Sequence, residues 1–345
     1  MAKATQTERD KHVKDNACER SAVKPKATRA AFGETLIELV NEGHDIVAVE
    51  ADLAGSTTTG KLGKEYPKRF FNAGIAETNM VGVAAGLALA GQVAFTGSFA
   101  VFGTGRVYDQ IRNTVCYNKL DVKIAPTHSG VTVGADGGSH QMLEDIALMR
   151  VLPHMRVLIP ADYTAAKAAV RYAATTPGPF YVRLGRAEVP DVYGTEGVAQ
   201  LPTTGGRPGE FEVTKAFVLR PGKDITIAAC GIEVAQALQA AELLATEGID
   251  AEVIDVMCVK PLDVETLVES ASKTGRLVTA EEHSVLGGMG SAVSEVLSEV
   301  CPVPTRRIGV VDRFGTSGSP DELIKYFNLD ATSIAAAAKE LFIDL

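Results

Sequence analysis

From Thr28 onward, short runs rich in Val, Ile and Ala alternate with longer stretches whose apolar residues recur at helical spacing. Short apolar runs are typical of buried strands, and the longer periodic stretches predict helices. In the first half we expect strands at Asp45–Glu50, Gln92–Thr96 and Asp121–Ala125, and helices at Ile75–Ala90 and Gly105–Tyr117. The small and polar residues Ala54–Gly60 predict a loop. Such alternation indicates a parallel sheet with helices on both faces.

The pattern lapses between Ala187 and Glu210, where glycine and proline are frequent, and this predicts a linker between two domains. The alternation then resumes, with strands expected at Asp224–Cys230, Asp250–Val256 and Arg276–Ala280, and helices at Val234–Thr246, after Pro261 and after Gly287. We therefore predict two doubly wound α/β domains, residues 28–188 and residues 212–345, joined by a linker at residues 189–211. The sheet of the smaller second domain should be mainly parallel.

The glycines Gly288 and Gly290 stand between a strand and a helix, where a dinucleotide fingerprint would lie. Val293 occupies the position at which that fingerprint has glycine or alanine. A single imperfect copy is weak evidence, so close packing of the helix against the strand is the preferred interpretation.

Composition and charge exclude several classes of protein. The chain has 345 residues, of which 46% are apolar and 22% charged, and this suits a soluble protein with a sizeable core. A net charge of −9 argues against a general nucleic-acid binder, and no apolar run is long enough for a membrane span. Five cysteines without paired spacing argue against disulfides or a zinc site, so we expect a cytoplasmic protein. Residues 1–27 are rich in charge, which predicts a flexible tail or docking arm.

The segment Asn72–Gly86 combines an acid with an unusually small helix surface. A strand end passes through Gly74 into a helix whose first turn carries Glu77. An acid there stabilises a helix by ~0.3–1 kcal/mol, and for Glu77 alone this structural role is the simpler interpretation. Another backbone could approach closely, as at a subunit contact, along the small residues Gly82, Ala84, Ala85 and Gly86.

Neighbouring segments favour a different interpretation of Glu77. Residues Gly74–Met80 resemble the GIAEQ-type signature of transketolases, deoxyxylulose-phosphate synthases and the β subunits of 2-oxo-acid dehydrogenases, although Thr78 stands where glutamine is more usual. In those families the matching glutamate contacts the aminopyrimidine nitrogen of thiamine diphosphate and promotes formation of the reactive carbon nucleophile. The resemblance therefore implies thiamine diphosphate as cofactor, with Glu77 as a catalytic and cofactor-binding residue.

The segment TGSFAVF and the helix after it resemble the cofactor side of transketolases. Phe99 and Phe102 correspond to aromatic residues that line the aminopyrimidine pocket, where aromatic contact excludes water. Gly105 stands where a third aromatic residue is common, and this leaves room for an unusual ketose or a sulfonated sugar. Arg106, in RVYDQIR, and Asp52, in the cofactor-side loop, are further candidates for cofactor contact.

Two histidines twelve residues apart, His128 and His140, are expected on loops after a strand, with Asp136 between them. A single histidine of this kind is more often structural, but the pair resembles the transketolase histidines that contact sugar hydroxyls and move protons. Carbon–carbon cleavage needs a base near a substrate hydroxyl, and neutral imidazole suits that task near neutral pH. The resemblance gives Asp136 a contact with a substrate hydroxyl.

Arg29, Ser56 and Arg186 match positions at which transketolases contact the substrate phosphate. Guanidinium groups are permanently charged and can bind phosphate through paired hydrogen bonds. The simpler alternative for each arginine is a surface salt bridge. Together the three residues indicate sugar phosphates as substrates.

Transketolases also need a diphosphate-binding domain, with a GDG motif and a following asparagine that holds the metal. Asp136-Gly137 is the nearest approach here, and no asparagine occurs between Asn118 and Asn328. The resemblance covers essentially Thr28–Leu345, as a pyrimidine-binding domain followed by a transketolase C-terminal domain. It implies a split transketolase, arranged as a heterotetramer, in which a large partner subunit supplies the diphosphate site and its Mg²⁺ or Ca²⁺.

The implied reaction transfers a two-carbon ketol unit from a ketose phosphate to an aldose phosphate. Three alternatives remain: the β subunit of a 2-oxo-acid dehydrogenase, a deoxyxylulose-phosphate-synthase-like enzyme, and a non-catalytic regulatory subunit. The dehydrogenase subunits lack the combination of His128, Asp136 and His140 with phosphate-binding arginines, and a scaffold would need none of them. We expect the chain alone to be inactive and to bind thiamine diphosphate poorly.

Overall fold

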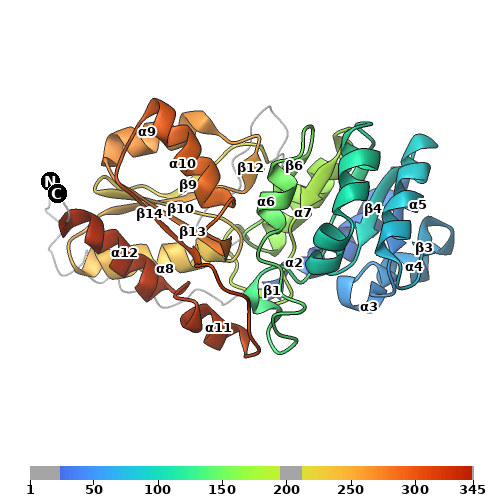
Figure 1. The fold of residues 1–345 in the computed structure, drawn as a ribbon, viewed down its shortest axis with the longest axis horizontal. Coiled ribbons are helices and arrows are strands. Elements are labelled where there is room, and N and C mark those ends of the chain that lie inside the picture. Colours follow the sequence, from blue (N-terminus) through green and yellow to red (C-terminus); the bar gives the residue numbers. More distant parts are fainter. Residues whose placement is uncertain (1–23, 195–211, 344–345) are drawn as a thin grey trace, which may run out of the picture.

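The computed structural model describes residues 24–194 and 212–343. Two main sheets lie at opposite ends of an elongated molecule (Figure 1). The sheet at the right of the view is built mostly from the first half of the chain, and the sheet at the left from the second half. Within the described ranges, no helix has the length and apolar character needed to cross a membrane.

The first sheet has the strand order β12-β6-β7-β5-β4-β2-β3, and all its pairs are parallel except β12 with β6. In that order the strands are Cys258–Lys260, Arg156–Leu158, Phe180–Val182, Val122–Ile124, Val93–Gly97, Ile46–Glu50 and Phe70–Asn72. Strand β12 comes from the second half of the chain, so both halves contribute to this sheet. Strand β12 could not be predicted from the sequence, because a three-residue edge strand has too few positions to show a period.

Helices cover both faces of the first sheet, as the sequence predicts. One face carries α2 (Thr28–Asn41) and α7 (Tyr163–Thr175), and the other carries α5 (Glu77–Leu89) and the wide helical segments η2 (Val101–Arg106) and η3 (Gln110–Cys116). The side chains of β2 alternate between these layers. Ile46 and Ala48 join the core that contains α2, whereas Val47 and Val49 join the core that contains α5.

The second sheet has the order β14-β13-β10-β11-β9, and only β9 is antiparallel to its neighbour. In that order the strands are Thr305–Val310, Leu277–Ser284, Ile225–Ala229, Ala251–Asp255 and Phe217–Arg220. Helices α8 (Glu233–Thr246) and α12 (Ala331–Ile343) lie below this sheet in Figure 1, and α9 (Val264–Thr274) and α10 (Met289–Val300) lie above it. The result is a second three-layer α/β unit, in agreement with the predicted fold class.

The structure corrects two local predictions in the first half. The predicted loop Ala54–Gly60 contains a one-turn helix, α3 (Ala54–Thr57), and the first residue of α4 (Gly60–Glu65). The helix predicted to begin at Gly105 begins at Val101 instead. Small residues obscured its first turn in the sequence: Gly103 is packed so closely that an added Cβ would lie 3.3 Å from Pro126.

The ends of the first unit also differ from the sequence-based division. Lys26–Ala27 were assigned to the tail but form β1, which pairs antiparallel with β8 (Glu188–Val189). Residues 1–23 of the predicted tail lie outside the described residues, as do residues 195–211 of the predicted linker. The pairing of β1 with β8 brings the start of α2 next to the segment after β7.

The glycines before α10 have a structural explanation. Buried Glu281 accepts hydrogen bonds from Met289 N at 2.7 Å and Gly290 N at 2.8 Å, so a carboxylate of this chain already occupies the helix N-terminus. A Cβ at Gly288 would lie 2.2 Å from Glu281 Oε2. The packing interpretation of this motif therefore agrees with the structure. The remaining short elements are η1 (Pro67–Arg69), η4 (Val131–Val133), α6 (Asp145–Arg150) and α11 (Pro320–Tyr326).

Candidate active site

The sequence-predicted site residues follow the carboxyl ends of neighbouring parallel strands. Asp52 and Ser56 follow β2, Glu77 follows β3, Phe99 and Phe102 follow β4, His128 follows β5 and Arg186 follows β7. The carboxyl ends of parallel strands meet at one edge of a sheet, so residues far apart in the sequence converge there. This edge is the usual position of ligand sites in open α/β sheets.

Glu77 is the first residue of α5, and its side chain is 4% exposed. Its two carboxylate oxygens accept hydrogen bonds from the guanidinium of Arg106, at 2.9 and 3.0 Å. That guanidinium is half exposed and lies 4.5 Å from the ring centroid of Phe102. The guanidinium of Arg106 thus contacts the ring face of Phe102 and the buried carboxylate of Glu77 at the same time.

Four rings form a cluster beside this pair. Phe99 stacks on Phe102 with centroids 6.2 Å apart, and on His128 with centroids 3.8 Å apart. His140 meets Phe102 edge-on at 5.5 Å. The structure therefore brings together the two phenylalanines and the two histidines that the sequence singled out, next to Glu77.

A continuation of strand pairing places His128 on Phe99. Ala100 N donates to Thr127 O at 2.8 Å, and Thr127 N donates to Ser98 O at 3.0 Å. The hydroxyl of Thr127 is hydrogen-bonded to Nδ1 of His128 at 2.8 Å. His128 has a left-handed backbone, with φ of 62°. This backbone conformation is unfavourable for a residue other than glycine, so His128 is a point of backbone strain.

Burial lowers the pKa of His128 to about 3, and the nearby charges of Arg29 and Arg186, together with His140, contribute to the shift. The imidazole is therefore neutral at physiological pH. Ser139 engages the second histidine in a similar way, with its hydroxyl 2.9 Å from Nδ1 of His140.

Arg29 and Arg186 are close because the start of α2 is bonded to the segment after β7. Gly185 N donates to the hydroxyl of Thr28 at 2.7 Å, and Arg29 N donates to Gly185 O at 3.3 Å. Burial and the charge of Arg186 lower the pKa of Arg29. The two guanidiniums repel each other, and an anion bound between them would offset that repulsion.

The third predicted phosphate contact, Ser56, binds Arg29 through its backbone. Arg29 donates to its backbone carbonyl at 2.8 Å, so Ser56 also orients the arginine. Asp52 is exposed and lies on the rim, where its Oδ1 accepts from Asn72 at 3.2 Å. Asp136 is exposed on the loop between the two histidines. In the part of the chain that the structure describes, neither aspartate is hydrogen-bonded to a histidine of the ring cluster.

Gly105, at the position where an aromatic residue is common, leaves open space. A Cβ added there would have only the terminal methyl of Met142 within 4 Å, at 3.9 Å. Gly105 is exposed, so a larger side chain would meet little resistance at this position.

Sequence reasoning missed two residues that support the site. Glu50 ends strand β2 as a fully buried acid, and Gln141 is buried directly after His140. A charged residue closing an apolar strand could have revealed Glu50. Gln141 gave no signal by itself, because its partners are remote in the sequence.

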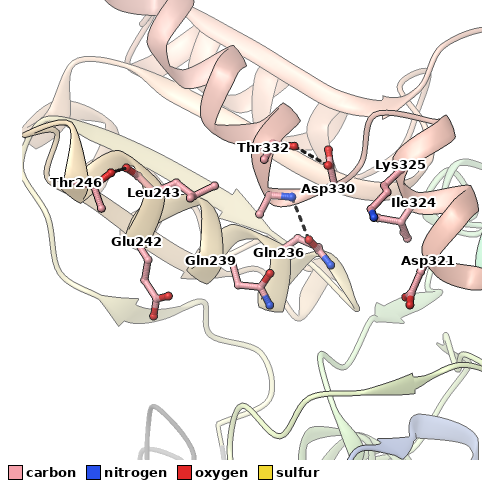
Figure 2. A pocket seen from close by; sticks show the side chains of 11 residues that line it. Gln236, Gln239, Glu242, Leu243, Thr246, Asp321, Ile324, Lys325, Asp330 and Thr332 are labelled. Carbon is pink, nitrogen blue, oxygen red and sulfur yellow. Dashed lines mark hydrogen bonds between the residues drawn. The ribbon is translucent and has the colours of Figure 1, made fainter. Parts of the chain in front are cut away.

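A pocket of about 720 Å³ between α8, α11 and the start of α12 is separate from this site (Figure 2). Three acids and one lysine line it, together with amides, hydroxyls and apolar groups: Glu242, Asp321, Asp330 and Lys325 are the charged members. No sequence-predicted site residue is among its lining residues. A lining with this charge does not favour a phosphate-bearing ligand.

Two family models match the chain: "Transketolase, pyrimidine binding domain" over residues 24–192 and "Transketolase, C-terminal domain" over residues 214–334. A protein of Methanocaldococcus jannaschii named as a transketolase C-terminal section is 46% identical over 91% of this chain and 96% of its own length. A 6-deoxy-6-sulfo-D-fructose transketolase subunit of a Clostridium species is 42% identical over 91% of this chain and 94% of its own length.

Among solved structures, a split gene transketolase described as an inactive β4 tetramer is 47% identical to this chain, with a TM-score of 0.81. The match covers 93% of this chain and 99% of that one. These similarities extend over both α/β units and over all the segments that supply the ring cluster. The chain belongs to the transketolase family.

Proposed function

We propose that this chain is the small subunit of a split, thiamine-diphosphate-dependent transketolase, with a pyrimidine-binding domain at residues 28–188 and a C-terminal domain at residues 212–345. The observation that carries the proposal is the ring cluster beside buried Glu77, next to the arginine pair Arg29 and Arg186. An acid, aromatic walls, imidazoles and guanidiniums are the groups that ketol transfer between sugar phosphates needs.

The residues around Glu77 fit the aminopyrimidine of thiamine diphosphate. The buried carboxylate and Phe102 already bind a flat cationic N–H donor, the guanidinium of Arg106. An aminopyrimidine offers the same features, an N–H edge and a flat face. When bound, thiamine diphosphate supplies a carbon nucleophile and an electron sink. Glu77 would share a proton with the ring nitrogen, and Phe99 and Phe102 would exclude water, after Arg106 has left the carboxylate.

The histidines serve the substrate hydroxyls. His128 is neutral and its Nδ1 is hydrogen-bonded to Thr127, so Nε2 is the ring nitrogen left for a sugar hydroxyl. Nε2 accepts from that hydroxyl in the tautomer whose Nδ1 carries the proton and donates it to Thr127. His140 faces the same rings from the next loop and takes part in moving the proton. Asp136 contacts a further hydroxyl, and Asp52 remains a cofactor-side candidate.

The phosphate end of the substrate lies between Arg29 and Arg186. Arg29 also reaches the Ser56 carbonyl, which keeps its guanidinium at the edge of the sheet. We leave the identity of the ketose unassigned, since one relative of similar length is named for a sulfonated fructose.

A large partner subunit completes the site with the diphosphate and the metal ion, in a heterotetramer. The outer face of α5 suits such a contact: Gly82 and Gly86 are exposed, and nothing lies within 4 Å of a Cβ added at either position. Leu89 continues the same face and is 75% exposed. A smooth helix face lets a second backbone approach closely.

The test is to assay the chain with and without a partner chain that carries a GDG motif, on a ketose phosphate donor and an aldose phosphate acceptor. The chain alone should be inactive, and the assembled enzyme should lose nearly all activity with Glu77→Ala. Glu65→Ala, which removes an exposed acid at the end of α4, is the matched control. Near-normal turnover by Glu77→Ala would indicate a regulatory subunit. Turnover of a 2-oxo acid in place of the ketose phosphate would indicate a dehydrogenase subunit.

A further inference from the structure

The short turn η4, Val131–Val133, begins three residues after His128, and side chains remote in sequence hold its backbone. Thr132 N donates to Glu282 Oε1 at 2.6 Å. The carbonyl of Val133 accepts from Arg186 at 2.5 Å, so the position of this turn also sets the position of that guanidinium. Both sides of the proposed substrate site therefore depend on one turn.

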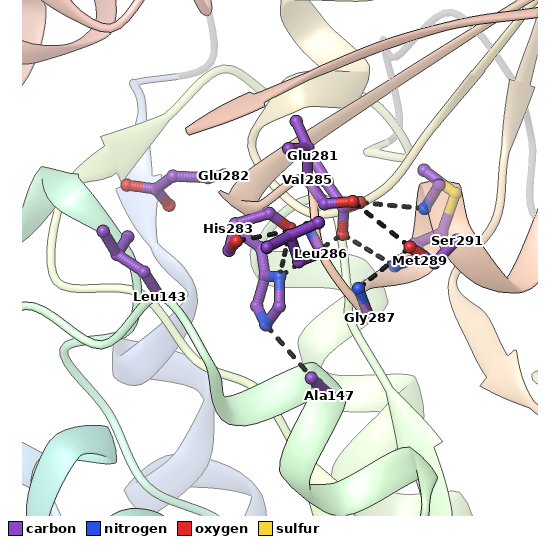
Figure 3. A network of polar contacts seen from close by, with 12 residues as sticks. Leu143, Ala147, Glu281, Glu282, His283, Val285, Leu286, Gly287, Met289 and Ser291 are labelled. Atoms are coloured by element: carbon purple, nitrogen blue, oxygen red, sulfur yellow. Dashed lines mark hydrogen bonds and ion pairs between the residues drawn. The ribbon is translucent and has the colours of Figure 1, made fainter. Parts of the chain in front are cut away.

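Glu282 reaches this turn from strand β13 of the second sheet. Side chains alternate along a strand, and Figure 3 shows Glu281 directed toward Met289 while Glu282 points the opposite way, toward Leu143. The carboxylate fits so closely against Gly130 that a Cβ there would lie 2.1 Å from its carboxyl carbon. A buried acid in direct contact with this loop fixes its path.

Gln141 holds the same turn from the other side. Its Nε2 donates to Val131 O at 2.9 Å and to Thr316 O at 2.9 Å. Thr316 belongs to the segment between β14 and α11 of the second half, and this segment lies against the loop of His140: a Cβ at Gly138 would be 2.6 Å from Gly315 O. Gln141 thus connects the loops of both histidines to the C-terminal half.

Apolar packing stabilises the turn in addition to these hydrogen bonds. Val131 is fully buried in a small core with Val310 of β14, with Leu323 of α11 and with Phe327 directly after that helix. The turn after His128 therefore packs against residues of the second half of the chain, although His128 itself follows a strand of the first sheet.

We propose that Glu282 and Gln141 are positioning residues, through which the C-terminal domain holds His128 and Arg186 in the geometry that the sugar phosphate requires. This role deepens the proposed function and rests on it. It also explains what the C-terminal domain contributes to the site. The chemistry stays with the residues along the edge of the first sheet, and the C-terminal domain fixes the turn that orients two of them.

The kinetic test uses the enzyme assembled with its partner. Glu282→Ala and Gln141→Leu should each raise KM for a ketose phosphate about tenfold, the effect expected when one hydrogen bond to a buried charged or polar group is lost. Glu282→Gln should restore KM to near the wild-type value. Burial raises the pKa of Glu282 to about 7, so a neutral amide that accepts the Thr132 hydrogen bond is a close substitute. The affinity for thiamine diphosphate should stay within about twofold of wild type, because Glu77 and Phe102 lie outside these contacts.

Glu281→Ala is the matched control, because it removes a buried acid of the same strand that caps α10 and does not touch the turn. It should lower stability without changing KM. An unchanged KM in both Glu282→Ala and Gln141→Leu, or an equal rise in Glu281→Ala, would overturn the positioning role.

A second measurement is independent of activity. The amide of Thr132 should exchange hydrogen slowly in the wild-type chain and in Glu281→Ala, and faster in Glu282→Ala. Rapid exchange of this amide in the wild type would show that the hydrogen bond between Thr132 and Glu282 is not maintained. If the assembled wild-type enzyme turned over no ketose phosphate while Thr132 remained protected, the proposed function would fail and the structural tie would stand.

Discussion

Glu50 provides a sharp test of how burial sets the energetics of this site. It ends strand β2 beneath the loop at residues 52–59, and its side chain is fully buried. The carboxylate accepts hydrogen bonds from the hydroxyls of Thr57 and Thr59 and from Leu53 N. Burial outweighs these hydrogen bonds and raises the pKa of Glu50 to about 7. Glu50→Gln keeps an acceptor for the hydroxyls and removes the charge.

The sign of the pH dependence follows from which state holds the proton. In the unfolded chain Glu50 ionises near its ordinary pKa of 4.5, whereas the folded chain keeps the proton until about pH 7. Between these values the folded state binds more protons, so the free energy of unfolding falls as pH rises, by up to about 1.4 kcal/mol per pH unit. The loss across this window is about 3 kcal/mol, and above about pH 7 the contribution stays constant.

Urea unfolding of wild type and Glu50→Gln across about pH 5 to 8 measures this contribution. The variant should lack the fall that Glu50 causes. The free energy of unfolding of the variant minus that of wild type should therefore increase by about 2.5 kcal/mol from pH 5 to pH 8. Glu65→Gln, an exposed acid at the end of α4, serves as control and should follow the wild type. A constant difference between Glu50→Gln and wild type at every pH would refute the reasoning.

Three further predictions concern the cofactor, the substrate and the partner. Arg106→Ala frees the carboxylate of Glu77; the half-exposed pair is worth roughly 1 kcal/mol, so the assembled enzyme should bind thiamine diphosphate about fivefold more tightly by calorimetry. Weaker binding would show that Arg106 holds the cofactor. The pKa of His128 should rise in inorganic phosphate, because the anion offsets the arginine charges that help to lower it; an unchanged NMR titration would contradict this. Gly82→Leu should block assembly with the partner in size-exclusion chromatography, whereas Ala245→Leu, at an exposed position of α8, should not; assembly by both would place the interface elsewhere.

Much of the candidate site could be predicted because its residues follow strand ends. The alternation of strands and helices fixes the fold class, and parallel strands place the residues after their carboxyl ends on one edge. Phe99, Phe102, His128 and His140 meet there as neighbours. Their roles were drawn from the resemblance to transketolases and remain proposals. The helix of Phe102 was placed too late, because Gly103 and Gly105 weaken its periodicity.

The sequence by itself determined the local features: Glu77 in the first turn of α5, the small outer face of that helix, and the order of strands and loops along the chain. These depend on residues a few positions apart, which pattern and propensity describe. Only the tertiary structure decided which groups meet across long separations. The pairing of Arg106 with Glu77, and the contacts of Glu282 and Gln141 with the turn after His128, arise where chain segments pack together. Burial then sets the energy of those contacts, and burial is a property of the folded whole.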